Sequence, residues 1–216
     1  VRIAVLDTGV EKSTRRNTPE FIQEHGSRIK GGKAFLGNEQ APWSKDLNGH
    51  GTHVTGLLLK VAPRTEIYVA RILRGGEETI DPANVEEALK YCIDEWNIDI
   101  ITMSFGFNKD QPNIKAQLKR AYDKDILVFS AASNDRASKP INIAWPARSP
   151  TVSCVFSANG EGGNSRFNPP ARRGLNFCDI WGGKKEGGTS TKHRSGTSFA
   201  TPIAAAIAAL VLEFAR

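Results

Sequence analysis

The hydrophobic positions of this chain form short apolar runs that alternate with longer amphipathic segments. Five runs rich in β-branched residues predict strands, at residues 3–6, 66–72, 98–103, 126–131 and 151–156. Four segments with helical periodicity predict helices, at residues 50–59, 83–96, 113–124 and 197–215. Apolar strands separated by helices are typical of a parallel sheet that is covered on both faces. The pattern therefore predicts an α/β fold with a doubly wound, mostly parallel sheet in three layers.

The 216 residues and their 39% apolar content predict one globular domain, residues 1–216. The chain opens directly on a strand and stops directly after a helix, so we expect a domain excised from a longer protein. The longest apolar run, from Phe199 to Leu212, contains Pro202 and is rich in alanine. We therefore expect no membrane-spanning segment.

The net charge of +6 is spread over basic clusters at Arg15-Arg16, Arg172-Arg173 and Lys184-Lys185. No aromatic residues are interleaved with these bases, as a nucleic-acid site would require. We expect solvated surface and no nucleic-acid partner.

Three cysteines, Cys92, Cys154 and Cys178, match no metal-binding spacing and cannot all pair internally. Buried free thiols are expected. This usage favours a reducing, intracellular compartment.

Polar residues follow several predicted strands at their carboxyl ends, where doubly wound sheets collect function. Asp7 ends the first strand, and Ser104 and Asn134 follow later ones. Asp7 is a candidate for the carboxylate that orients a catalytic histidine, although an aspartate before Thr-Gly can also simply cap a turn. Asn134 is a candidate side-chain donor to an oxyanion, or an ordinary turn asparagine.

Ser198 lies where a Gly-Thr turn enters the last predicted helix. Free N–H groups and the positive end of the helix dipole favour a developing oxyanion there, and a neighbouring base would make the hydroxyl a nucleophile. The simpler interpretation is a helix cap.

His50 begins a glycine-rich helix and is the candidate base. His53 shares its helix face, so a metal site is an alternative. No HExxH pattern accompanies the pair, and no third ligand is evident. We expect no metal and no cofactor.

The order Asp7, His50, Ser198 is one of the three chain orders in which the serine-hydrolase triad is known. Six blocks that span nearly the whole chain carry a family resemblance: VRIAVLDTGV, NGHGTHVTGLL, ITMSFG, AASND, WPARSPTVSCVFSAN and SGTSFATPIAAAIAAL. On these blocks the chain resembles the subtilases, the subtilisin-like serine peptidases. The resemblance implies that Asp7 is the orienting acid, His50 the base, Ser198 the nucleophile and Asn134 the oxyanion donor.

The resemblance also implies a substrate site. Residues Ser104, Phe105 and Gly106 would pair with an extended peptide as an added strand. Ser133, Asp135 and Ala144 would surround the pocket for the residue before the scissile bond. Two of these positions, Ser133 and Ala144, are often glycine in the family, so we expect a narrower pocket here.

Two departures from the family pattern stand out. No calcium-binding insertion follows the histidine helix, because Leu59 continues through Lys60-Val61-Ala62-Pro63 directly to the next strand. The family's Ala-Pro-Gly is replaced by Trp181-Gly182-Gly183. Short, calcium-poor domains of this kind are similar to peptidase domains within large intracellular fungal proteins, which implies fusion to other domains.

The sequence therefore predicts a serine endopeptidase that hydrolyses protein or peptide substrates through an acyl-enzyme. The alternative is a catalytically silent module of the same fold that binds peptides in the groove.

Overall fold

The structure is a computed structural model. It describes residues 1–12, 20–37, 42–74, 79–134, 143–158, 163–166, 168–169, 177–181 and 196–216. The predicted basic clusters Arg15-Arg16, Arg172-Arg173 and Lys184-Lys185 lie outside these residues, as do Asp135 and Gly182-Gly183.

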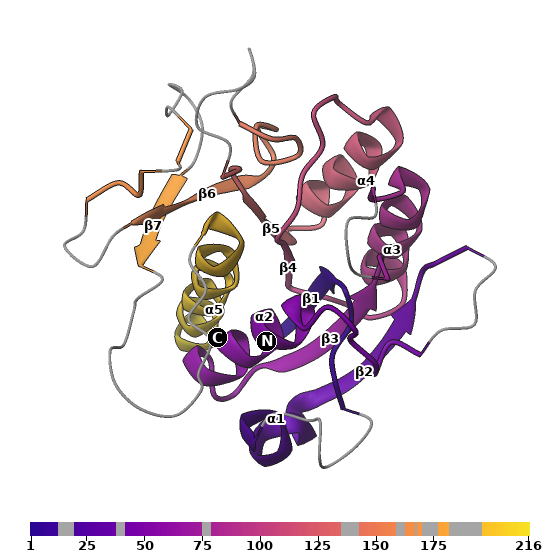
Figure 1. The fold of residues 1–216 in the computed structure, drawn as a ribbon, viewed down its shortest axis with the longest axis vertical. Coiled ribbons are helices and arrows are strands. Elements are labelled where there is room, and N and C mark those ends of the chain that lie inside the picture. Colours follow the sequence, from indigo (N-terminus) through magenta and orange to yellow (C-terminus); the bar gives the residue numbers. More distant parts are fainter. Residues whose placement is uncertain are drawn as a thin grey trace.

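One parallel sheet runs through the described part of the chain (Figure 1). Its strands are β1 (Arg2–Asp7), β2 (Ile29–Ala34), β3 (Glu66–Arg71), β4 (Ile100–Met103), β5 (Leu127–Ala131), β6 (Ser153–Ala158) and β7 (Phe177–Trp181). They lie in the order β2-β3-β1-β4-β5-β6-β7, and every neighbouring pair is parallel. The strand order reverses between β1 and β4, which makes the carboxyl ends of these two strands the expected place for a site.

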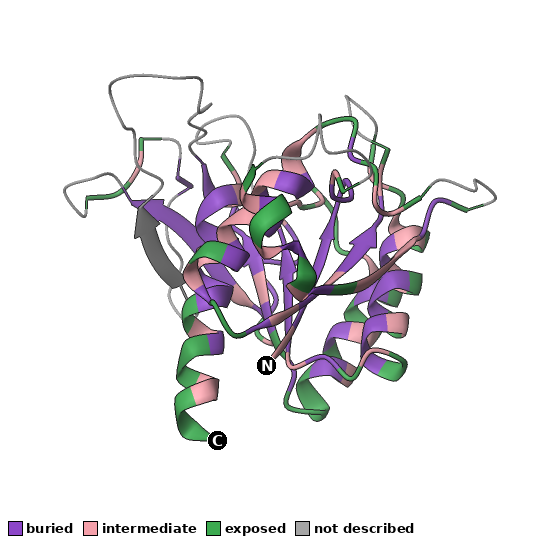
Figure 2. Cartoon of the chain, turned by 90° about the horizontal axis from the view of Figure 1, so that it is seen from below, coloured by how far each residue is buried: buried purple, intermediate pink, exposed green. Residues whose placement is uncertain are grey.

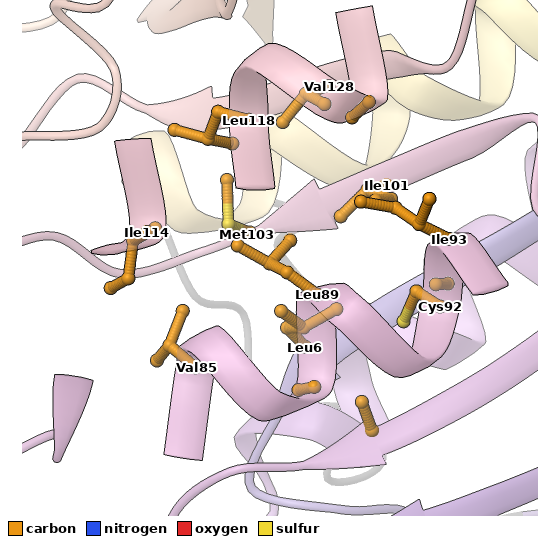
Figure 3. Packing of buried hydrophobic residues seen from close by; sticks show 14 of the residues in the cluster. Leu6, Val85, Leu89, Cys92, Ile93, Ile101, Met103, Ile114, Leu118 and Val128 are labelled. Carbon is orange, nitrogen blue, oxygen red and sulfur yellow. The ribbon is translucent and has the colours of Figure 1, made fainter. Parts of the chain in front are cut away.

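Two layers of helices cover the sheet, as the apolar pattern predicted (Figure 1). The helices are α1 (Glu20–His25), α2 (His50–Val61), α3 (Pro82–Asp94), α4 (Pro112–Asp123) and α5 (Thr197–Ala215), with a 3-10 turn at Gly26–Arg28. Alternate residues of β1 serve the two layers: Ala4 and Leu6 pack with α3 and α4, whereas Ile3 and Val5 pack with α2 and α5. Figure 3 shows Leu6 and Met103 of the sheet against Leu89 and Leu118 of the first layer. The predicted doubly wound α/β class is confirmed.

Three elements were not predicted from the sequence. The edge strand β2 has the sequence IKGGKA, which carries few apolar residues. Its Gly32 is required by packing, because a Cβ there would lie 2.5 Å from the Trp43 ring. Helix α1 has only six residues. Strand β7 pairs with β6 at the other edge of the sheet.

Helix α5 is long and apolar enough to cross a membrane by length and composition, with a mean hydropathy of 1.8 over its most apolar window. The apolar run that contains Pro202 therefore reaches this length, contrary to the expectation from the sequence, and Pro202 lies within the continuous helix that the pattern predicted at residues 197–215. The first half of α5 is buried against the sheet, and exposure increases toward its C-terminus (Figure 2). In all, 44% of its most apolar window is buried within the protein.

Cys92 and Cys154 are buried and free, as predicted. Burial raises the pKa of both thiols, that of Cys154 to about 12. A thiol that stays protonated is a poor nucleophile, so these two cysteines act as small apolar side chains.

Candidate active site

The predicted acid and base lie in direct contact at the switch point of the sheet. Asp7 is the last residue of β1 and is 3% exposed, and His50 is the first residue of α2. The His50 ring nitrogen Nδ1 lies 2.8 Å from Asp7 Oδ1 and 3.0 Å from Oδ2. A carboxylate can only accept here, so Nδ1 carries the proton and Nε2 keeps its lone pair.

This contact depends on a close approach of α2 to the end of β1. The Gly51 backbone faces Gly9, and a Cβ on Gly51 would lie 2.2 Å from the Gly9 carbonyl oxygen and 3.2 Å from Asp7 Cβ. Gly49, the residue before α2, has a φ of 80°, which favours glycine. The two glycines that flank His50 therefore let the helix begin directly over Asp7.

Ser198 is the second residue of α5 and is partly exposed. Its hydroxyl donates to the Ser104 carbonyl at 3.2 Å, and the Ser104 hydroxyl donates to the Ser198 carbonyl at 2.7 Å. Pro202 explains the second bond, because proline has no N–H for the carbonyl four residues before it. The proline thus leaves the Ser198 carbonyl available to Ser104, which ties the segment after β4 to the turn that carries Ser198.

Phe199 joins the starts of α2 and α5. Its buried ring lies 5.3 Å from the His50 ring and 5.1 Å from the His53 ring, measured between centroids. His53 meets Phe199 edge-on, so packing against this aromatic ring occupies its face toward α5. Among the described residues, no three histidine, cysteine, aspartate or glutamate side chains gather into a metal site.

Asn134 follows β5 and contacts the start of α5. Its Oδ1 accepts the Thr197 N–H at 3.0 Å and the Thr197 hydroxyl at 3.2 Å. A backbone N–H can only donate, which fixes the orientation of the amide and directs Nδ2 elsewhere. Gly196 has a φ of 144°, and a Cβ on it would lie 3.1 Å from Nδ2. Asn134 is exposed, and its Nδ2 lies next to Gly196, two residues before Ser198 in the chain.

The predicted substrate segment forms one wall of a cleft next to this cluster. The cleft has a volume of about 210 Å³ and is lined by Asp7, Thr8, Asn48, His50, Leu73, Ile80, Ser104 and Phe105. Sequence reasoning did not single out Leu73 or Ile80, which make part of its apolar wall. Leu73 follows β3 and could have been found as an apolar residue at a strand end.

Gly106 and Ala144 lie against each other near the cleft. A Cβ on Gly106 would lie 2.5 Å from Ala144 Cβ, and the neighbours Phe107 and Trp145 exchange two backbone hydrogen bonds. Ser133 precedes the predicted oxyanion donor and has a φ of 130°, which is unusual for a residue with a side chain. Asp135, the remaining residue predicted for this pocket, lies outside the described residues.

Sequence reasoning also missed Asp46, which lies in the loop before α2. It is 7% exposed and accepts hydrogen bonds from Thr8, from its own loop and from Thr52. The signal was an aspartate four residues before the first helical residue, His50, since aspartates near a helix start often accept its free N–H groups.

Comparison with known proteins identifies the family of this chain. A model of the Subtilase family matches residues 1–216. Subtilisin-like protease het-Q2 of Podospora anserina is 32% identical over 99% of this chain and 69% of the relative. The thermostable alkaline protease of Halalkalibacterium halodurans is 31% identical over 97% of this chain and 56% of the relative. The chain thus spans 69% and 56% of the length of these two relatives.

The fold is also similar to solved structures. A cold-adapted subtilisin-like serine proteinase superimposes with a TM-score of 0.78 at 26% identity, over 99% of this chain and 75% of that one. The prenylagaramide maturation protease PagA gives a TM-score of 0.76 at 22% identity, over 99% of this chain and 75% of that one. With the family match over the whole length, these findings show that the chain belongs to the subtilase family of subtilisin-like serine proteases.

Proposed function

We propose that this chain is a serine endopeptidase that cleaves peptide bonds through an acyl-enzyme. Ser198 is the nucleophile, His50 the general base, Asp7 the orienting acid and Asn134 a donor to the oxyanion. The observation that carries the proposal is the two-oxygen contact between buried Asp7 and His50 Nδ1, at 2.8 and 3.0 Å. Because Nδ1 carries its proton in that contact, Nε2 is the ring nitrogen that would accept a hydroxyl proton.

In the proposed reaction, Ser198 Oγ attacks the scissile carbonyl carbon while His50 Nε2 takes the hydroxyl proton. The oxygen of the tetrahedral intermediate accepts hydrogen bonds from Asn134 Nδ2 and from the Ser198 N–H. His50 then gives its proton to the departing amine, and the peptide bond breaks. A water molecule, activated by His50 in the same way, hydrolyses the ester and restores the Ser198 hydroxyl.

We propose that an extended peptide binds along Ser104, Phe105 and Gly106 as an added strand, a mode of recognition that reads the main chain. The cleft beside these residues supports this placement, because it also contains Asp7 and His50. Ser133 and Ala144 would narrow the pocket for the residue before the scissile bond. The contact of Ala144 with Gly106 supports that role for Ala144.

The second candidate function is a silent peptide-binding module. The ordered contacts of Asp7, His50 and Asn134 favour the enzyme, because a binding groove has no need of an oriented imidazole. The test is cleavage of unfolded casein and of fluorogenic peptides by the wild type and by Ser198→Ala. Ser153→Ala, at the amino end of β6, is the matched control.

We expect cleavage by the wild type and the control, and none by Ser198→Ala with an unchanged circular dichroism spectrum. Cleavage that persists in Ser198→Ala would contradict the assignment of the nucleophile. Peptide binding without cleavage by the wild type would favour the binding module.

A further inference from the structure

Asp46 is a buried carboxylate that contacts the chain neighbours of both Asp7 and His50. Its Oδ1 accepts the Thr8 hydroxyl at 2.9 Å, the Gly49 N–H at 2.8 Å and the Asn48 N–H at 3.1 Å. Its Oδ2 accepts the Thr52 N–H at 2.8 Å and the Thr52 hydroxyl at 2.7 Å. Both oxygens therefore face backbone donors, which an amide NH₂ group at either place could not satisfy.

On the helix side, these bonds fix the first turn of α2. The N–H groups of a first turn have no partner within the helix, and Asp46 supplies an acceptor for that of Thr52. Gly49 and Thr52 flank His50 in the chain, so Asp46 holds the backbone on both sides of the base. A carboxylate near the positive end of the helix dipole is also electrostatically favourable.

On the strand side, Asp46 determines which carboxylate accepts the hydrogen bond of the Thr8 hydroxyl. That hydroxyl lies 2.9 Å from Asp46 Oδ1 and 3.3 Å from Asp7 Oδ1, and it has one proton to donate. The shorter contact directs the proton to Asp46, and the hydroxyl oxygen accepts the Gly51 N–H at 2.9 Å. Asp7 then receives the Thr8 N–H at 2.8 Å and His50 Nδ1.

We propose that Asp46 is a positioning residue for the triad, which holds the start of α2 over Asp7 and keeps the Thr8 hydroxyl from donating to Asp7. Keeping this donor away matters, because each hydrogen bond to a carboxylate lowers its basicity and hence its stabilisation of the imidazolium. The inference rests on the proposed function. It adds a residue that touches neither substrate nor nucleophile.

The variant Asp46→Asn tests the proposal, with Asp99→Asn as the matched control. Asp99 is a partly buried carboxylate that accepts the Arg2 N–H at 2.8 Å, beyond the amino end of β4 and far from the triad. We expect Asp46→Asn to lower kcat by about 10- to 100-fold, as a small misplacement of reacting groups does, with KM within about twofold. Asp99→Asn keeps the wild-type kcat.

The pH profile separates positioning from a general loss of stability. In Asp46→Asn a negative charge near His50 is lost. Where the amide NH₂ group takes the place of Oδ1, the Thr8 hydroxyl also loses this acceptor and donates to Asp7. Both changes disfavour the imidazolium, so the acid limb of kcat/KM moves to lower pH, by about 0.3–1 unit. The charged groups on the surrounding elements are unchanged in the variant: Asp7, Glu11, Lys45, His50 and Arg71.

A second pair of variants keeps the proposal falsifiable if Asp46→Asn does not fold. Thr8→Ser retains the hydroxyl that Asp46 orients, and Thr8→Val removes it. We expect Thr8→Ser to stay within about threefold of the wild-type kcat and Thr8→Val to fall by about tenfold or more. In the Thr8→Val background, Asp46→Asn shifts the acid limb less than it does in the wild type.

The proposal is overturned if Asp46→Asn, folded, keeps both its kcat and its acid limb, or if Thr8→Val is as active as Thr8→Ser. Labelling of the wild type by a fluorophosphonate distinguishes failure of the proposed function from failure of the inference about Asp46. An unlabelled, inactive wild type contradicts the proposed function, whereas a labelled, active wild type with an indifferent Asp46 contradicts only this inference.

Discussion

Gly51→Ala is the substitution that most directly disturbs the contact between α2 and β1. The new Cβ would lie 2.2 Å from the Gly9 carbonyl oxygen, whereas ordinary contact begins near 3.4 Å. The atom it meets belongs to the backbone and cannot rotate away, so the start of α2 has to move by about 1.2 Å from the end of β1. His50 begins that helix, so the 2.8 Å bond between Nδ1 and Asp7 Oδ1 is stretched or broken.

The expected magnitudes follow from this displacement. Overpacking of this kind costs about 1–3 kcal/mol, which for a domain of this size lowers Tm by about 2–12 °C. A displacement of about 1 Å at a catalytic group costs about 100-fold in kcat.

Gly56→Ala is the matched control on the same helix. Its Cβ would meet only Phe21 Cδ1, at 4.0 Å. Replacing a helical glycine by alanine adds about 0.5–1 kcal/mol of stability, so Tm rises by about 1–4 °C and kcat is retained. The same substitution five residues apart thus has opposite effects on stability.

The assays are differential scanning fluorimetry and steady-state cleavage of a fluorogenic peptide. Thermal unfolding is followed in the Ser198→Ala background, so that self-digestion does not affect Tm. If Gly51→Ala kept the Tm and the kcat of the wild type, the proposed approach of α2 to β1 would be refuted.

Four further predictions follow from the site. Asn134→Ala lowers kcat by about 10²–10³-fold with little change in KM, which is the cost already known for such a donor in subtilisin. A change confined to KM would contradict the oxyanion role. Ala144→Gly relaxes the selectivity of a peptide library toward larger residues before the scissile bond, by about 1–3 kcal/mol for each methylene, and an unchanged profile would show that the pocket lies elsewhere. Activity survives EDTA, because only residues 62–65 connect α2 to β3 and leave no insertion there for a calcium site. Loss of activity with EDTA that calcium restores would refute this prediction. Ser133→Gly raises Tm by a few degrees, because the backbone strain relieved at a φ of 130°, about 1–3 kcal/mol, exceeds the entropic cost of glycine. A lower Tm would show that the Ser133 backbone is not strained.

The layers of the fold could be predicted because their signal is local. An apolar strand or an amphipathic helix shows its period within a few residues, and β1, β3 and α4 were found in this way. The edge strand β2 was not predicted because it carries few apolar residues, and the glycine at position 32 is required by contacts with Trp43 and the Val69 carbonyl, which no strand period reveals. The predicted helix at residues 197–215 does continue through Pro202, and the hydroxyl of Ser104, from another element, supplies the hydrogen bond that the proline cannot donate to the Ser198 carbonyl.

The candidate triad could be predicted because short motifs carry it, but its support could not. Asp46 has no conspicuous motif, and its importance lies in five donors that only the folded chain brings together. The role of Phe199 also requires the fold, since its ring meets two histidines from α2. Residues that position catalytic side chains are thus hard to predict from the sequence, because their contacts come from distant parts of the chain.

The most direct test of the central claim is the site of covalent labelling by a fluorophosphonate, mapped by peptide mass spectrometry. An activated serine is the only kind that reacts rapidly, so the account predicts one stoichiometric adduct on Ser198. The adduct should be lost in Ser198→Ala and strongly slowed in His50→Ala, where the base is missing. A wild type that stays unlabelled, or an adduct that forms equally fast without His50, would contradict the assignment of Ser198 and His50 as nucleophile and base.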